Sequence, residues 1–162
     1  EGKGSKFWFT LPFQPKKELF PSEEQKPVTL EKIARSEVTI LIAEDNSSNY
    51  RLFESILKPE YKLIHAWNGK EAVELFHQHK PQLILMDIKM PVMDGYQVLN
   101  TIRNMEKQRG IEGDDRVKII MMTALNEQKN VRKAFEMGCT VYCAKPVDLD
   151  KLKNVLKKLK LI

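Results

Sequence analysis

Acidic, hydroxyl and basic side chains follow several short apolar segments of this 162-residue chain. They are Glu44 and Asp45 after residues 38–43, Asp87 after 83–86, Thr123 after 117–122 and Lys145 after 141–144. Three carboxylates that lie together repel one another, and a cation such as Mg²⁺ relieves that repulsion. A Lys and a Thr beside them can neutralise and hydrogen-bond a phosphoryl group, which a carboxylate can accept as a nucleophile. If the segments converge, these residues predict a Mg²⁺-dependent phosphoryl site.

Each residue taken alone has a simpler explanation. An acidic residue after a strand commonly caps the next helix, and a Thr or Lys at that position is commonly solvated. The functional interpretation therefore depends on elements that bring all five side chains to one place.

Apolar runs and segments of helical period alternate along the chain after residue 36. The expected strands are 38–43, 61–66, 83–86, 117–122 and 141–144, and the expected helices are 46–57, 69–80, 94–107, 126–137 and 148–160. This alternation predicts a parallel sheet with helices on both faces. Ligands of such sheets bind beyond the carboxyl ends of the strands, where all five residues stand.

The net charge of +5 is unevenly distributed. Residues 1–36 hold seven Lys and Arg against five Glu, residues 37–144 hold 14 against 15 acidic residues, and residues 145–162 hold six Lys against two Asp. With no basic groove lined by aromatics, we expect no nucleic-acid partner. No apolar run reaches the roughly 20 residues that cross a bilayer, so we expect no membrane contact by this fragment.

The cysteines and histidines do not form a metal motif. Cys139 and Cys143 are too few for a disulfide framework or a four-ligand zinc site, and we expect buried thiols in a reducing compartment. His77 and His79 point to different faces of a helix, and His65 lies in a strand. We expect none of the three to bind metal or accept a phosphoryl group.

Four motifs resemble response-regulator receiver domains of two-component signalling over residues 37–162. They are Ile-Leu-Ile-Ala-Glu-Asp-Asn, Leu-Ile-Leu-Met-Asp-Ile-Lys-Met-Pro-Val-Met-Asp-Gly, Ile-Ile-Met-Met-Thr-Ala and Tyr-Cys-Ala-Lys-Pro, in that order. The resemblance implies an α/β, flavodoxin-like (βα)5 fold with a doubly wound five-stranded parallel sheet in the order 2-1-3-4-5.

The resemblance also implies a role for each motif residue. Asp87 would be the phosphoacceptor and a Mg²⁺ ligand, beside Asp45, the backbone carbonyl of Lys89 and, through water, Glu44. Thr123 and Lys145 would contact the phosphoryl group, and Tyr142 would switch its position together with Thr123. The peptide bond between Lys145 and Pro146 would be cis. Lys89 and Leu125 would tune the lifetime of the phosphorylated state.

The family mechanism transfers a phosphoryl group to Asp87 from the phosphohistidine of a histidine kinase or a phosphotransfer domain. The product alters the face formed by helix 126–137, strand 141–144 and helix 148–160, through which a homodimer can form. Leu125 cannot orient an attacking water by hydrogen bonding, so we expect slow autodephosphorylation.

The opening residues, Glu-Gly-Lys-Gly-Ser-Lys-Phe-Trp-Phe-Thr-Leu-Pro, resemble the end of a histidine-kinase ATPase domain. We therefore interpret residues 1–13 as a remnant of its last strand, 14–36 as a Pro- and Glu-rich linker and 37–162 as the receiver domain. This implies a fragment of a hybrid histidine kinase without the kinase active site. We expect a cytoplasmic location, which includes the cytoplasmic part of a membrane-anchored sensor kinase.

Other functions remain open at this stage. The chain could be a receiver-like interaction module that does not cycle through phosphorylation, although its complete set of site residues argues against this. A haloacid-dehalogenase-type phosphatase needs a second acid two residues after the nucleophile, where Lys89 stands. A Rossmann dehydrogenase needs a Gly-x-Gly-x-x-Gly after the first strand, and this chain has none there.

Overall fold

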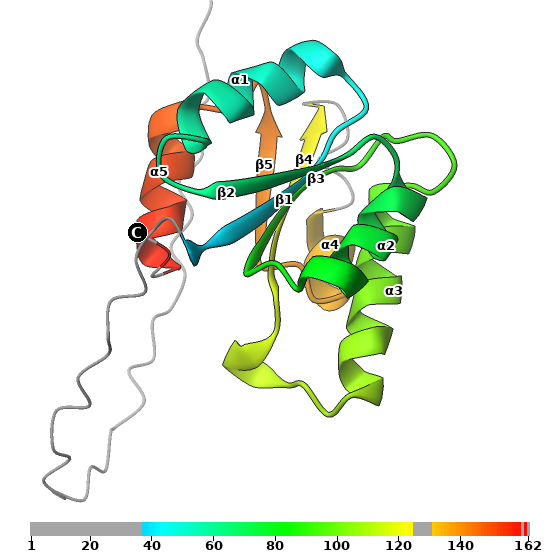
Figure 1. Cartoon of the computed structure of the whole chain (residues 1–162). Helices are drawn as coiled ribbons and strands as arrows, with labels where there is room; N and C mark the ends of the chain where they lie inside the picture. The colour runs from blue at the N-terminus through cyan, green and yellow to red at the C-terminus, as the bar shows by residue number, and fades with distance from the viewer. Residues whose placement is uncertain (1–36, 125–130, 160, 162) are drawn as a thin grey trace, which may run out of the picture. The chain divides into compact units, whose positions relative to one another are not determined.

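The computed structural model describes residues 37–124, 131–159 and 161. The proposed kinase remnant and linker, Leu125 and the first part of the expected helix 126–137 lie outside these residues. Strands and helices alternate as β1 (Thr39–Ala43), α1 (Ser47–Leu57), β2 (Lys62–Ala66), α2 (Gly69–His79), β3 (Leu83–Asp87), α3 (Gly95–Gln108), the 3-10 turn η2 (Gly113–Asp115), β4 (Lys118–Ala124), α4 (Val131–Glu136), β5 (Val141–Lys145) and α5 (Leu149–Lys158) (Figure 1).

All five strands are parallel and follow the order β2-β1-β3-β4-β5. This confirms the predicted flavodoxin-like fold. Apolar side chains alternate between the two faces of the sheet, as the strand period requires. Leu41 and Ile84 pack with residues of α2, α3 and α4, whereas Ile40 and Leu83 pack with residues of α1 and α5. The sheet therefore separates two buried layers.

Polar residues cap the N-termini of four helices that follow strands at the carboxyl edge of the sheet. Asn46, Asn68, Asp94 and Asp148 each accept hydrogen bonds from backbone N–H groups in the first turn of the helix they precede. Asp94 forms a capping box with Gln97. These caps keep the connections from strand to helix short and fix the loops around the site.

Three strands end later than the sequence predicts. β3 includes Asp87, β4 continues to Ala124 and β5 includes Lys145. The reason is strand pairing, because Asp87 pairs with Met122 and Ala124 pairs with Lys145 in the ladder. The site side chains are thus held by the sheet itself.

At the opposite edge of the sheet, a buried ion pair connects α3 to the start of β4. Arg103 Nη1 donates to Glu106 Oε2 at 2.6 Å, and the N–H of Val117 donates to Glu106 Oε1 at 2.7 Å. Arg103 also donates to the carbonyl oxygens of Val117 and Gly138. All the polar atoms of this pair are satisfied by hydrogen bonds, which a buried charge pair requires.

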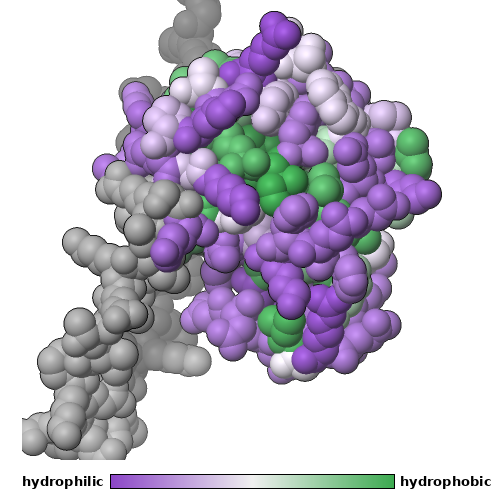
Figure 2. Space-filling view, viewed as in Figure 1, coloured by the Kyte–Doolittle hydropathy of each residue, from purple (hydrophilic) through white to green (hydrophobic). Residues whose placement is uncertain are grey.

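The surface is mainly hydrophilic on the face shown in Figure 2, with a smaller apolar area near its centre. Four large apolar residues of the described chain are exposed, namely Leu52, Trp67, Val92 and Phe135. None of the described helices is long and apolar enough to cross a membrane.

Candidate functional site

Glu44 and Asp45 follow β1 and differ sharply in their surroundings. Glu44 is fully buried, whereas Asp45 is exposed. The N–H of Glu44 donates to the Ala66 carbonyl at 3.1 Å, which extends the pairing of β1 with β2. Asn49 of α1 donates to Glu44 Oε1 at 2.9 Å. The Glu44 carboxylate is therefore fixed by both a strand and a helix.

Lys145 joins the two buried carboxylates. Its Nζ lies 2.8 Å from Glu44 Oε2 and 2.8 Å from Asp87 Oδ2. Asp87 is 7% exposed, and its Oδ1 also accepts a long hydrogen bond of 3.4 Å from the Lys89 N–H. One ammonium thus serves two carboxylates that have little contact with water.

The pKa values of the pair follow from this arrangement. Burial, assisted by the charge of Glu44, raises the pKa of Asp87 above its ordinary value although Lys145 opposes the shift. Burial acts to lower the pKa of Lys145, but its hydrogen bonds to Asp87 and Glu44 outweigh this and raise the pKa. Lys145 is therefore charged at neutral pH.

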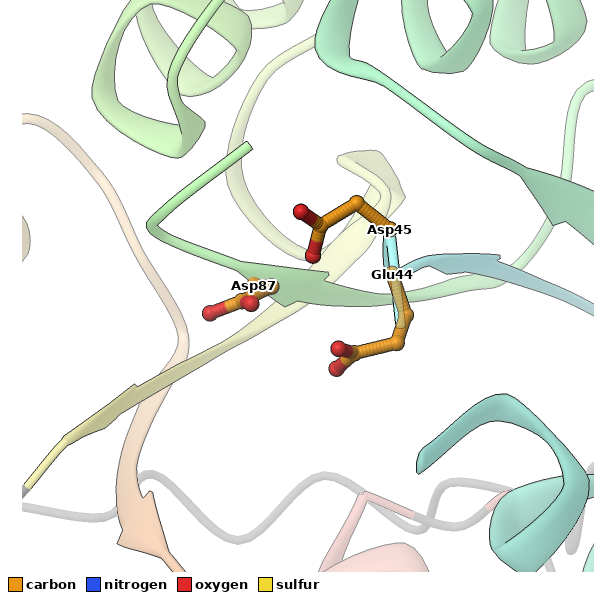
Figure 3. Close-up of side chains that lie close together, drawn as sticks. All are labelled: Glu44, Asp45 and Asp87. Atoms are coloured by element: carbon orange, nitrogen blue, oxygen red, sulfur yellow. The ribbon is translucent and has the colours of Figure 1, made fainter. Parts of the chain in front are cut away.

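The three carboxylates form an oxygen-only cluster. One carboxylate oxygen from each of Glu44, Asp45 and Asp87 lies within 4.8 Å of the others (Figure 3). Hard divalent cations such as Mg²⁺ bind through this type of donor, and few protein ligands suffice because Mg²⁺ retains waters. The residues present therefore fit the predicted cofactor. The histidines and cysteines of the described chain do not contribute to this cluster.

Thr123 and Tyr142 lie on the same face of the neighbouring strands β4 and β5. Thr123 is buried, and its Oγ1 donates a long hydrogen bond of 3.3 Å to the Ala124 carbonyl. Tyr142 is half-buried and packs against the core layer under α2, α3 and α4. The peptide bond between Lys145 and Pro146 is cis.

Residues 40–157 match the family described as response regulator receiver domain. The chain belongs to this family. It is a receiver domain of two-component signalling, and its motifs and fold agree in this assignment.

Curated relatives of the receiver domain come from bacteria and yeast. Sporulation initiation phosphotransferase F of Bacillus subtilis is 30% identical over 120 residues, which cover 74% of this chain and 90% of that protein. The osmolarity two-component system protein SSK1 of Saccharomyces cerevisiae is 36% identical over 135 residues, which cover 69% of this chain and 19% of that protein.

Two solved structures are informative. One is a co-crystal structure of the Saccharomyces cerevisiae histidine phosphotransfer signaling protein Ypd1 and the receiver domain of its downstream response regulator Ssk1. The matching chain is 34% identical, with a TM-score of 0.70, and the match covers 76% of this chain and 88% of that chain. The receiver domain of sensor histidine kinase PA1611 from Pseudomonas aeruginosa, with magnesium coordinated in its active site cleft, is 31% identical, with a TM-score of 0.65 and coverage of 76% and 97%.

Sequence reasoning missed an aromatic arrangement beside the site. The ring of His65 stacks on Tyr50 with centroids 3.7 Å apart, and its Nε2 donates to the Glu44 carbonyl at 2.9 Å. Trp67 lies at a tilt against the same imidazole. Their spacing in the sequence gives no signal of this, because Tyr50 comes from a different element.

Proposed function

We propose that this receiver domain accepts a phosphoryl group on Asp87 from a phosphohistidine, with Mg²⁺ as cofactor. The observation that carries the proposal is the position of the buried Asp87 carboxylate, 2.8 Å from Lys145 Nζ and inside the cluster with Glu44 and Asp45. A carboxylate can act as the nucleophile in phosphoryl transfer when its surroundings balance the charge.

The cofactor site would consist of oxygen donors from the loop after β1 and from the end of β3 with the loop that follows it. Asp45 and Asp87 supply carboxylates, Lys89 supplies its backbone carbonyl, and Glu44 acts through water. A bound Mg²⁺ supplies positive charge for the phosphoryl oxygens. A domain that is 31% identical carries magnesium in its active site cleft, which supports this proposal.

The residues of the chain have separate tasks in the transfer. A carboxylate oxygen of Asp87 attacks phosphorus as the bond between phosphorus and the donor imidazole nitrogen breaks, and the electron pair of that bond returns to the imidazole. Lys145 neutralises charge on the phosphoryl oxygens, and the Thr123 hydroxyl rotates to donate a hydrogen bond to one of them. The product is an acyl phosphate on Asp87.

The chemical change would reach the surface through Thr123 and Tyr142. When the Thr123 hydroxyl turns to the phosphoryl group, space opens on its face of the sheet and the Tyr142 ring moves inward. The face formed by α4, β5 and α5 then changes shape, which can control a homodimer or another partner.

The phosphodonor would be a histidine kinase or a histidine phosphotransfer protein. The co-crystal structure of Ypd1 with a receiver domain that is 34% identical supports the second class. We also propose a cytoplasmic hybrid histidine kinase as the parent, with residues 1–13 from its ATPase domain, 14–36 as a linker and 37–162 as the receiver. The receiver of sensor kinase PA1611 supports this organisation.

The competing function is an interaction module that does not cycle. Beryllofluoride with Mg²⁺ mimics an aspartyl phosphate, so it should shift the amide resonances around Asp87, Thr123 and Tyr142 in the wild-type chain. The Asp87→Asn variant should give no such shifts, whereas Asp150→Asn, an exposed acid on α5, should respond as the wild type does. Absence of any response in the wild type would contradict the proposal and favour the interaction module.

A further inference from the structure

A pocket of about 680 Å³ lies at the pole of the domain opposite the acidic cluster. It is bounded by the ends of α2 and α3, the turn η2 and the start of β4. Figure 1 shows η2 at the lower end of the molecule, away from the arrowheads of β4 and β5. The volume falls in the range of pockets that hold small organic ligands, roughly 300–1,000 Å³.

The pocket combines an apolar wall with positive charge. Its apolar residues include Phe76, Ile111, Val117 and Leu161. Its cations are Lys80, Arg109, Arg116 and Lys118. An apolar wall with a few polar groups at fixed positions is typical of sites for small molecules.

The acidic residues of the pocket leave part of this positive charge uncompensated. Both oxygens of Glu106 are occupied by Arg103 and the Val117 N–H, so Glu106 is neutralised from outside the pocket. Asp114 has a fully exposed side chain 3.6 Å from Lys118. Asp115 is exposed as well. Four cations therefore face at most two available carboxylates.

Hydrogen-bond partners within the protein account for some of these cations but not for all of them. Arg109 donates to His77 Nδ1 at 2.7 Å, and Lys118 donates to the Asp114 carbonyl at 3.0 Å. Lys80 caps α2 and Arg109 caps α3, so both also balance the negative ends of those helices. Arg116 caps neither α2 nor α3, and it follows directly after the 3-10 turn η2. Its Nε is buried and has no hydrogen-bond partner among the described residues.

A buried guanidinium N–H without a partner carries a free-energy cost, and each such group in a native structure calls for an explanation, such as a water or an anion that binds it. We propose that this pocket binds a small amphipathic anion, an organic carboxylate or phosphate ester, with its charged group on Arg116 and its apolar body against Phe76, Ile111 and Val117. Glu106 lines the pocket and pairs with Arg103, and Arg103 donates a hydrogen bond to the carbonyl of Gly138 in the turn before β5. A ligand bound in this pocket would therefore act on α3, on the start of β4 and on the loop before β5.

The test is an NMR titration of the full ¹⁵N-labelled chain without Mg²⁺. The probes are phenyl phosphate and benzoate, with inorganic phosphate as an anion without an apolar body and benzyl alcohol as an apolar body without charge. We expect phenyl phosphate or benzoate to shift the amides of Ile111, Val117 and Lys118 in a saturable manner. Which of the two binds more tightly distinguishes the phosphate from the carboxylate class.

Two substitutions locate the charge contact. Arg116→Gln should weaken binding of the better probe about tenfold or more, because a hydrogen bond to a charged group is lost. Arg51→Gln removes an exposed arginine on α1 and should leave binding unchanged. Should Arg116→Gln perturb the fold, the response of the wild type to the four probes still decides the proposal.

Three results would overturn the inference. They are no shift of the pocket amides with any probe, equal binding of inorganic phosphate and phenyl phosphate, or equal binding by the wild type and a folded Arg116→Gln. The experiment uses no phosphoryl transfer, and Asp87→Asn should bind the probe as the wild type does. A negative result here therefore leaves the proposed function of Asp87 untouched.

Discussion

Lys145 Nζ lies 2.8 Å from Glu44 Oε2, although the two residues are 101 positions apart in the sequence. The contact crosses the sheet from the loop after β1 to the end of β5. It shows that the ammonium pairs with both buried carboxylates of the cluster, Glu44 and Asp87, and not with Asp87 alone.

Removal of the Lys145 charge should destabilise the domain in the absence of Mg²⁺. Lys145→Met leaves Glu44 and Asp87 without their shared cation, and the loss of a charge-assisted hydrogen bond costs about 1.5–3 kcal/mol. Urea unfolding at pH 7.5 measures the change in the free energy of unfolding. The control is Lys153→Met, an exposed lysine on α5, which should stay within about 0.5 kcal/mol of the wild type. Equal stability of the two variants would contradict the shared-cation interpretation.

Mg²⁺ should stabilise the wild-type domain through the acidic cluster. A ligand that binds only the folded state adds about 2.7 kcal/mol at a hundredfold excess over its Kd. Thermal unfolding with and without 10 mM MgCl₂ should show a rise in Tm that EDTA reverses. Asp45→Ala should abolish that rise, whereas Asp150→Ala should preserve it. A rise of the same size in Asp45→Ala would place the metal elsewhere.

The lifetime of the proposed acyl phosphate should depend on residue 125. Leu125 offers no group to orient a hydrolytic water, so Leu125→Glu should hydrolyse Asp87 phosphate faster, and Leu125→Met should not. The loss of radiolabel after phosphorylation by a small-molecule donor measures both rates. Unchanged or slower decay in Leu125→Glu would contradict this expectation.

Val92 holds backbone strain beside the site. Its φ is +70° and its side chain is 80% exposed, so a β-branched residue sits in the left-handed region without compensating burial. That conformation costs about 1–2 kcal/mol for most L-residues and less for Asn. Val92→Asn should therefore raise the free energy of unfolding by up to about 1 kcal/mol in urea, while Val92→Ile should not. Lower stability of Val92→Asn than of Val92→Ile would contradict the assignment of strain.

Cys139 should be protected from alkylation well above neutral pH. Burial raises its pKa to about 11 from an ordinary value of 9.0. In a Cys143→Ser background, the folded protein should react with iodoacetamide roughly a hundredfold more slowly at pH 8 than the urea-unfolded protein, because the thiolate is the nucleophile.

The same shift has a consequence for stability. Between pH 9 and 11 the unfolded thiol has lost its proton while the folded thiol retains it, so stability should fall as pH rises through this window. Cys139→Ala should flatten the slope of the free energy of unfolding against pH over that range. An identical slope in the variant would contradict the raised pKa.

The sequence predicted a parallel sheet covered by helices and the residues at the ends of its strands, and the resemblance to receiver domains supplied the strand order. Short apolar runs that alternate with segments of helical period favour such a sheet, and its carboxyl edge then collects Glu44, Asp45, Asp87, Thr123 and Lys145. Other features depend on three-dimensional geometry. The stacking of His65 on Tyr50, the second contact of Lys145 and the left-handed backbone at Val92 arise between elements or from loop closure, which residue spacing does not encode.

Among the strands that the structure describes, β5 is the last to be synthesised and lies at an edge of the sheet, paired with β4 alone. The ribosome incorporates Asp87 before Lys145, and the two residues are 58 positions apart in the sequence. At about 5–20 residues per second this interval lasts roughly 3–12 s. During that time the nascent chain contains Glu44 and Asp87 but not the Lys145 ammonium that pairs with both of them in the folded domain. The receiver domain therefore cannot complete its site before its C-terminal segment has been translated.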